Sequence, residues 1–249
     1  MKISKALDLK EREIVSFVGG GGKTTLMFCL AEEIPLQKKV VITTTTKIFL
    51  PPPDKFPLLL LGEEEQIEKD LAVYLQSGLK PVIASGMLEN NKINGITSRQ
   101  LSLLKEYADF ILVEADGSKG FSLKGHLDYE PVVSELTTVL VVVIGADIIG
   151  KTLDGKHVHR PEVVSERTGR EMGSIIDSEL IAQLITHPEE LLRGSPPCAR
   201  VVPFINKIDR LNNLGEVYRL GRLLLRKNIR KVLLGSAIGE NPVLDILEY

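Results

Sequence analysis

The feature that most constrains the fold is a series of short apolar runs separated by stretches with a helical pattern. Most of the runs are continuous in valine, isoleucine and leucine, which is typical of strands covered on both faces. The predicted strands cover residues 14–18, 39–44, 58–61, 81–84, 110–114, 139–144, 200–205 and 231–234. The predicted helices cover residues 24–33, 64–76, 98–107, 178–186 and 214–226. This alternation predicts an α/β fold with three layers and a doubly wound, mainly parallel sheet.

The length of 249 residues suits a single domain over residues 1–249. Three regions interrupt the alternation. Pro51-Pro52-Pro53-Asp54 predicts a stiff connector. Residues 117–129 are rich in glycine, serine and lysine, and residues 150–171 are polar. We therefore expect residues 117–171 to contain a lid or insertion.

Composition excludes several classes of partner. The net charge of −2 and the aromatic content of 5% argue against a nucleic-acid partner. Because the longest apolar run is too short to cross a bilayer, we expect no membrane partner. The two cysteines lie far apart, and the first residues lack the apolar core of a signal peptide. These features predict a cytoplasmic protein.

A glycine turn joins the first predicted strand to the first predicted helix. Four glycines are followed by Lys23, which can reach the β- and γ-phosphates, and by Thr24, whose hydroxyl can bind Mg²⁺. The usual phosphate-loop pattern has its first glycine where this chain has Phe17. A chance glycine turn is the alternative, and a dinucleotide site fits less well because a lysine follows the last glycine. The predicted phosphate-binding residues are Gly19, Gly20, Gly21, Gly22, Lys23, Thr24 and Thr25.

Two carboxylates end the predicted strand 110–114. Glu114 and Asp116 share one face if the chain stays extended, at the sheet edge where doubly wound folds bind ligands. We expect Asp116 to hold Mg²⁺ through water, and Glu114 to orient a nucleophilic water or to pair with Lys23. A solvated acid pair is the alternative. Asp147 follows another apolar run and suits either a ligand contact or a plain turn.

The second predicted strand ends in the run Thr43-Thr44-Thr45-Thr46-Lys47. Four β-branched residues are typical of a strand end. The same hydroxyls, with Lys47, would also suit a position beside the γ-phosphate. Both interpretations stand, and Lys47 is a candidate catalytic residue.

An Asn-Lys-x-Asp segment follows the strand 200–205. The Asp209 carboxylate can accept hydrogen bonds from guanine N1–H and its 2-amino group, and adenine offers neither donor on that edge. Lys207 would lie along the base plane and Asn206 would brace neighbouring loops. The loop at Ser236 and Ala237 suits a backbone N–H that meets guanine O6. An ordinary polar turn is the alternative, and together these residues favour GTP.

His157 and His159 would lie on one side of an extended segment, as a pair of metal ligands does. We favour a plain loop pair because no cysteine or further histidine is near them in the sequence.

Four blocks of the sequence together resemble a known family. The blocks are Val18–Thr25, Thr44–Ile48, Val113–Gly120 and Asn206–Asp209. They resemble the selenium-dependent hydroxylase accessory proteins, the YqeC-like family, and more broadly the P-loop GTPases that serve metallocentre assembly and protein targeting.

The resemblance implies a P-loop NTPase fold and Mg²⁺-dependent binding and hydrolysis of GTP or ATP. It also implies a role in maturing selenium-dependent molybdenum hydroxylases, with a client metalloenzyme or cofactor-maturation protein as partner. Many relatives in the wider superfamily act as dimers. Carried onto this chain, Gly19–Thr25 form the phosphate loop, Asp116 is the magnesium-side acid, and Asn206, Lys207 and Asp209 bind the base. The wider pattern Asp-x-x-Gly is altered, because Gly117 or Gly120 follows Asp116 instead.

The leading hypothesis is GTP hydrolysis coupled to cofactor assembly or delivery, with Lys23 and backbone amides stabilising phosphate charge. A second hypothesis is a small-molecule kinase or nucleotidyl-type transferase that uses the nucleotide as substrate and binds an acceptor in region 117–171. A third is a nucleotide-binding module without catalysis.

Overall fold

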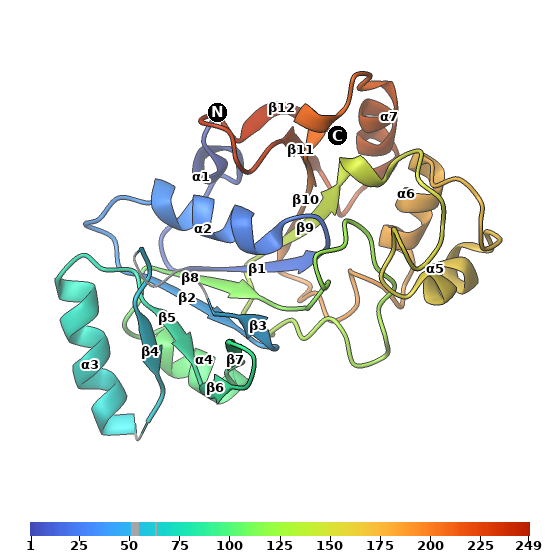
Figure 1. The fold of residues 1–249 in the computed structure, drawn as a ribbon. Helices are drawn as coiled ribbons and strands as arrows, with labels where there is room; N and C mark the ends of the chain where they lie inside the picture. Colours follow the sequence, from blue (N-terminus) through green and yellow to red (C-terminus); the bar gives the residue numbers. More distant parts are fainter. Residues whose placement is uncertain (51–54, 63) are drawn as a thin grey trace.

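In the computed structural model, which describes residues 1–50, 55–62 and 64–249, nine strands form one sheet (Figure 1). Their order is β12-β11-β10-β9-β1-β8-β2-β5-β4. Every neighbouring pair is parallel except β11 and β12. The strands are β1 (Glu13–Gly19), β2 (Val40–Thr44), β4 (Leu58–Leu60), β5 (Val82–Ala84), β8 (Phe110–Glu114), β9 (Val139–Gly145), β10 (Arg200–Asn206), β11 (Lys231–Gly235) and β12 (Val243–Glu248). A second, antiparallel sheet contains β3 (Ile48–Phe49), β7 (Lys92–Asn94) and β6 (Gly86–Leu88).

Helices cover both faces of the large sheet (Figure 1). The α-helices are α1 (Ile3–Ala6), α2 (Lys23–Glu33), α3 (Glu64–Gln76), α4 (Ser98–Leu104), α5 (Pro161–Thr168), α6 (Ser178–Thr186) and α7 (Gly215–Leu224). The 3-10 helices are η1 (Ala146–Ile148) and η2 (Ile208–Arg210). Of the described helices, none is both long and apolar enough to cross a membrane.

The predicted α/β fold with a mainly parallel sheet is confirmed. All eight predicted strands and all five predicted helices are present. The predicted helices 98–107 and 214–226 are too long, since α4 ends at Leu104 and α7 at Leu224. Strand β12, helices α1 and α5 and the small sheet were not predicted, because they are short or exposed on one side. The predicted connector Pro51–Asp54 lies outside the described residues.

Strand β9 shows why the apolar runs are continuous. Val139, Val141 and Val143 pack into the cluster that contains α1 and α2. The alternate residues Leu140, Val142 and Ile144 pack into the cluster that contains α6 and α7. Because helices cover both faces, neither set can be polar.

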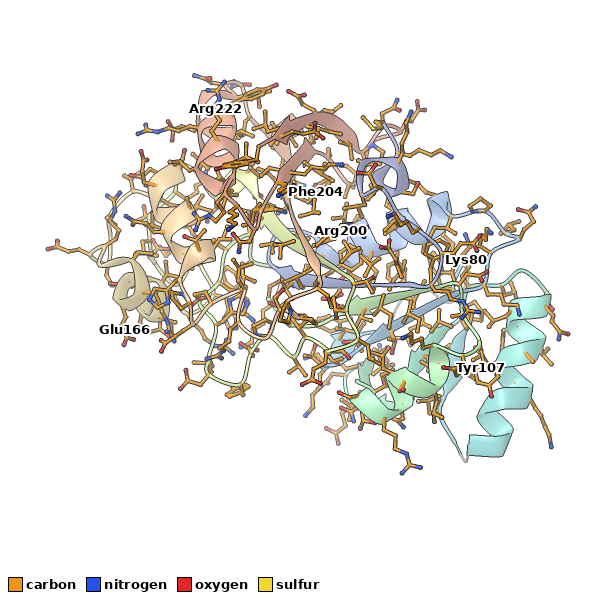
Figure 2. The ribbon with its side chains drawn as sticks, turned by 180° about the vertical axis from the view of Figure 1, so that it is seen from behind. Lys80, Tyr107, Glu166, Arg200, Phe204 and Arg222 are labelled. Carbon is orange, nitrogen blue, oxygen red and sulfur yellow. The ribbon has the colours of Figure 1, made fainter. Side chains whose placement is uncertain are left out.

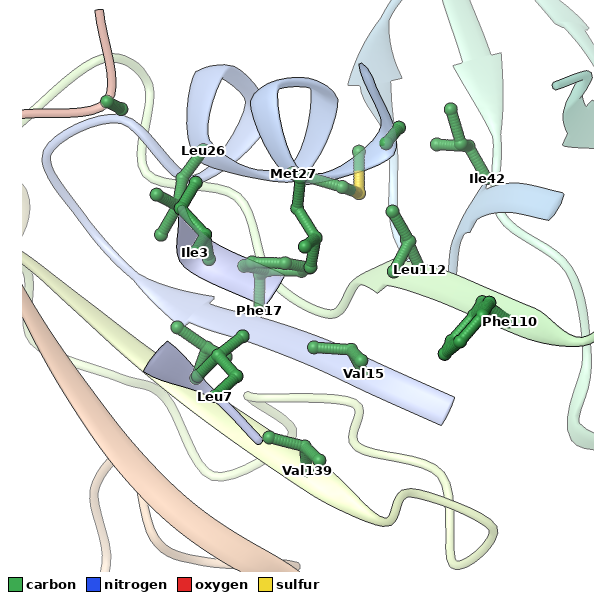
Figure 3. Close-up of a cluster of buried hydrophobic side chains, with 14 of the residues drawn as sticks. Ile3, Leu7, Val15, Phe17, Leu26, Met27, Ile42, Phe110, Leu112 and Val139 are labelled. Atoms are coloured by element: carbon green, nitrogen blue, oxygen red, sulfur yellow. The ribbon is translucent and has the colours of Figure 1, made fainter. Parts of the chain in front are cut away.

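Helix α2 packs directly on β1 (Figure 3). Phe17 is fully buried in β1 and belongs to the same apolar cluster as Leu26 and Met27 of α2. The position where the usual motif has glycine is therefore part of the strand, and the turn begins at Gly19. At the other end of α2, the buried Lys80 ammonium donates to the carbonyls of Ala31 and Ile34 (Figure 2). Both ends of the helix are thus fixed.

Candidate functional site

Four glycines form the turn between β1 and α2. Gly19, Gly21 and Gly22 have φ values of 98°, 83° and 113°, which residues with a Cβ rarely adopt. A Cβ on Gly19 would lie 2.3 Å from the Val143 carbonyl oxygen, and one on Gly21 would lie 2.3 Å from the Gly145 nitrogen. Glycine is therefore required here both for the backbone angle and for the close approach of β9.

The amides of this turn divide into two groups. Those of Gly19, Gly20 and Gly21 donate to Asp116, to the Val143 carbonyl and to the Phe121 carbonyl, respectively. The four amides from Gly22 to Thr25 donate to no other described residue. Because these four belong to the start of an 11-residue helix, they form a position where an anion can bind.

Lys23 lies buried beneath the turn, with its side chain 2% exposed. Its ammonium donates to the Gly19 carbonyl at 2.7 Å and lies 3.1 Å from Asp116 Oδ1. It is also 3.8 Å from Glu114 Oε1. The structure therefore brings together the predicted lysine and both predicted carboxylates.

Glu114 contacts the predicted magnesium ligand Thr24. The Thr24 hydroxyl donates to Glu114 Oε2 at 2.6 Å. Burial raises the pKa of Glu114, although Lys23 and the Thr24 hydrogen bond oppose that shift. The carboxylate that contacts Thr24 is thus Glu114, at the end of β8, and not Asp116.

Asp116 is surrounded by donors and positive charges. Its Oδ2 accepts from the Gly19 amide at 3.0 Å, and it lies 2.7 Å from His126 Nε2 and 3.5 Å from Lys124 Nζ. Burial alone would raise the pKa of Asp116, but Lys23, His126 and Lys124 hold it well below its ordinary value. This carboxylate anchors the glycine turn to the chain that follows β8.

The contacts continue from His126 to Glu190, whose Oε2 lies 2.7 Å from His126 Nδ1. Burial lowers the pKa of His126, but the hydrogen bonds to Asp116 and Glu190 outweigh it and raise the pKa. The network is buried throughout. We call this set the buried charge network: Lys23, Glu114, Asp116, Lys124, His126 and Glu190.

Sequence reasoning missed Lys124, His126 and Glu190. Lys124 and His126 lie in a segment rich in glycine, serine and lysine, which is typical of a solvated loop. Glu190 is 64 positions from His126, so no local pattern links the two. A lone histidine ten residues after Asp116 was the available signal.

Asn206 braces two loops, as the sequence predicted. Its Nδ2 donates to the Gly21 carbonyl at 2.7 Å, and its Oδ1 accepts from the Ala237 amide at 2.9 Å. Ser236 follows β11, and its amide donates to Pro242. The ends of β10 and β11 are therefore tied to the glycine turn.

The other predicted base-binding residues have different surroundings. Lys207 has a left-handed backbone with φ 64°, and its ammonium lies 2.7 Å from Ser122 Oγ and 3.0 Å from Asp147 Oδ2. Asp209 is exposed in η2 and has no partner among the described residues. The Lys207 ammonium therefore donates within the protein, and the Asp209 carboxylate is free to accept hydrogen bonds from a ligand.

The threonine run closes β2. The hydroxyls of Thr43, Thr44 and Thr45 donate to the carbonyls of Ile83, Glu114 and Val132, respectively. These bonds support the interpretation of the run as a strand end. Lys47 is exposed and contacts no other candidate residue among those described.

The two loop histidines have separate partners. His157 Nδ1 lies 2.9 Å from Asp154, and His159 stacks on Phe121 with ring centroids 5.9 Å apart. In the described part of the chain, no group of three or more His, Cys, Asp or Glu side chains is placed to hold a metal ion. His157 and His159 thus contact different neighbours.

A cleft of about 750 Å³ extends from the start of α2 to the loop after β11. Its lining includes Thr24 and Thr25 at the start of α2, and Ala237 and Ile238 in the loop after β11. Phe28, which stacks on Phe56 with ring centroids 4.7 Å apart, contributes to an apolar wall. The cleft adjoins the free amides of α2.

The sequence model of the YqeC protein family matches residues 15–162. The chain belongs to this family. The matched range holds the glycine turn and Glu114, Asp116, Lys124 and His126. The YqeC protein of Escherichia coli (strain K12) is 28% identical over 237 residues, which cover 94% of this chain and 91% of that protein.

Two solved structures are also similar. The signal recognition particle receptor FtsY from Elizabethkingia anophelis has a TM-score of 0.42 and 13% identity, and the match covers 94% of this chain but only 61% of that one. A GTPase from Pyrococcus abyssi in its apo form has a TM-score of 0.37 and 15% identity, with 91% of each chain covered.

Proposed function

We propose that this protein binds a nucleoside triphosphate with Mg²⁺ and hydrolyses it, and that GTP is the preferred nucleotide. The observation that carries the proposal is the set of four free amides from Gly22 to Thr25, beside the buried Lys23 ammonium. Free N–H groups, a helix N-terminus and a lysine together stabilise phosphate charge. The left-handed glycines keep Cβ atoms away from the turn.

Thr24 and Glu114 suit a magnesium ion that is bound together with phosphates. A hydroxyl and a carboxylate 2.6 Å apart are the oxygen ligands that Mg²⁺ accepts, directly or through water. Mg²⁺ commonly takes its other ligands from phosphates and water, which fits a site with few protein ligands. When bound, the ion would neutralise phosphate charge.

We assign the magnesium-side role to Glu114 rather than to Asp116. Both Asp116 oxygens already face positive groups or amide donors of the protein. Asp116 then acts as a positioning residue that holds Lys23 and the Gly19 amide. This assignment revises the expectation from the sequence, in which Asp116 took the metal.

The base would occupy the cleft between α2 and the loop after β11. Asp209 is free to accept from guanine, whereas the Ala237 amide already donates to Asn206. The Ile238 amide donates to no other described residue and lines the cleft. We therefore assign recognition of guanine O6 to Ile238 instead of Ala237.

The biological role follows from the family resemblance alone. We propose that nucleotide hydrolysis serves maturation of selenium-dependent molybdenum hydroxylases, or cofactor delivery to them, through contact with a client protein. Slow turnover without that client is expected, because partner proteins often complete such sites.

The test is a thermal-shift panel of ATP, GTP and xanthosine triphosphate, each with and without Mg²⁺. A ligand at 100 times its Kd stabilises the folded state by about 2.7 kcal/mol. We expect the largest shift for GTP with Mg²⁺, and no shift in Lys23→Ala. Lys105→Ala, at an exposed site on the end of α4, is the matched control. A wild-type protein that no nucleotide stabilises would contradict the proposal.

Asp209→Asn tests base recognition separately. An amide can donate where the carboxylate only accepts, so preference should move from GTP towards xanthosine triphosphate. An unchanged preference for GTP would remove Asp209 from the site while leaving phosphate binding intact.

A further inference from the structure

A second cavity, of about 460 Å³, lies beside the glycine turn and is lined mainly by positive side chains. Its charged lining is Lys119, Lys151, Lys156, Lys207, Arg210 and Asp147, and His157 also contributes. Phe121 lines the cavity, and its backbone carbonyl accepts a hydrogen bond from the Gly21 amide. The cavity therefore adjoins the turn. We call it the basic cavity.

The positive charge of the basic cavity is largely unpaired. Asp147 is the single carboxylate in its lining, and it lies 3.0 Å from Lys207 and 3.5 Å from Arg210. The ammonium groups of Lys119, Lys151 and Lys156 have no partner among the described residues. The chain as a whole carries a net charge of −2, so this excess is local.

The backbone around the cavity is held in place. Lys119 and Lys207 have positive φ values of 48° and 64°. Residues that carry a Cβ rarely adopt such angles. Asp154 accepts from the amides of Lys156 and His157 at 2.9 and 3.1 Å, which fixes the turn that carries Lys156. Residues other than glycine that are held in such strained backbone conformations are typical of functional sites.

We propose that the basic cavity binds a small phosphate-bearing anion as a ligand separate from the nucleotide on the glycine turn. Like charges around one concave surface raise the local potential and attract a multiply charged anion. Four of the five cations are lysines, which bind phosphate as point charges, and the volume suits a small molecule.

Inorganic pyrophosphate is the probe, because its binding can be measured by calorimetry without any nucleotide. We expect wild-type protein to bind it, and Lys151→Ala/Lys156→Ala to raise the Kd at least tenfold. The matched control is Lys69→Ala/Lys105→Ala, which removes two exposed lysines outside the cavity and should leave the Kd unchanged. No binding by the wild type, or equal affinity in the cavity variant, would overturn the proposal.

Two further arms separate the basic cavity from the glycine turn. Lys23→Ala should still bind pyrophosphate, and wild-type protein saturated with nucleotide and Mg²⁺ should do so too. If Lys23→Ala abolishes the binding while its circular dichroism stays that of the wild type, or if nucleotide displaces the probe, the pyrophosphate sits on the turn and the separate site is refuted. Because the first measurement contains no nucleotide, failure of the proposed GTP binding would leave its result unaffected.

Discussion

The buried charge network and the basic cavity both include residues of the segment 117–126, yet their charges have opposite surroundings. In the network, each carboxylate faces a cation or an imidazole and almost no side chain reaches water. In the cavity, three lysines stay exposed, and none of them has a partner in the described part of the chain. An unpaired charge destabilises a protein when it is buried, but it has little effect on stability when water solvates it. The network therefore fixes the geometry of the turn, and the cavity keeps its charge available for a ligand.

The largest expected effect that tests this contrast comes from Asp116→Asn. The amide keeps the shape of the side chain but leaves Lys23, Lys124 and His126 without their shared negative partner. Removing one member of a buried ion pair costs about 3–5 kcal/mol. We expect a loss of that size in the free energy of unfolding, measured by urea denaturation.

The matched control for that variant is Asp147→Asn in the basic cavity. Asp147 is partly exposed and pairs with Lys207 and Arg210, so the loss should stay below about 1 kcal/mol. Equal losses in the two variants would show that the buried and exposed charges do not differ as proposed.

His126→Gln should have the next largest effect. The imidazole joins Asp116 to Glu190 through two contacts of 2.7 Å, and a glutamine cannot span both. A hydrogen bond to a charged group contributes about 1.5–3 kcal/mol, and we expect a loss in that range on unfolding. His157→Gln, whose partner Asp154 is partly exposed, is the control and should change stability little. Retention of full stability by His126→Gln would indicate that the network is dispensable.

The positions of the central strands and of the glycine turn followed from the sequence because they depend on local patterns. The continuous apolar runs of β1, β8, β9 and β10 indicate strands that are buried on both faces. The four glycines indicate a turn with positive φ values. These features need no knowledge of distant contacts.

The remaining features depend on which distant residues meet. His126 is held between Asp116 and Glu190, and Glu190 lies 64 positions away in the sequence. Lys207 has a left-handed backbone and contacts Asp147, which is also distant in the sequence. The basic cavity draws lysines from three loops that are spread over about ninety residues of sequence. The sequence of a loop shows which residues are charged but not whether each charge has a partner. Sequence alone therefore could not separate the network from the cavity.

Acid should weaken the contacts around Glu130, which lies at the edge of the network and contacts Lys124 and Arg160. Burial alone would raise its pKa, but these two cations lower it below the ordinary value of 4.5. The resulting stability is present above pH 4.5 and is lost as the pH falls through the lower, folded-state pKa. Glu130→Gln should therefore reduce the slope of unfolding free energy against pH below 4.5. If the wild type and the variant lose stability in parallel, Glu130 contributes nothing to the slope.

The smallest expected effect is that of Lys151→Ala/Lys156→Ala on stability, which should stay within about 0.5 kcal/mol of the wild type. Both side chains are exposed and pair with none of the described residues, so their removal breaks no described contact and relieves repulsion. Salt screens repulsion between exposed charges, so added sodium chloride should stabilise the wild type slightly more than the variant. Urea denaturation at low and high salt measures both quantities. A loss above about 1 kcal/mol would mean that these lysines support the fold, and weaker anion binding by the variant would then have a structural cause.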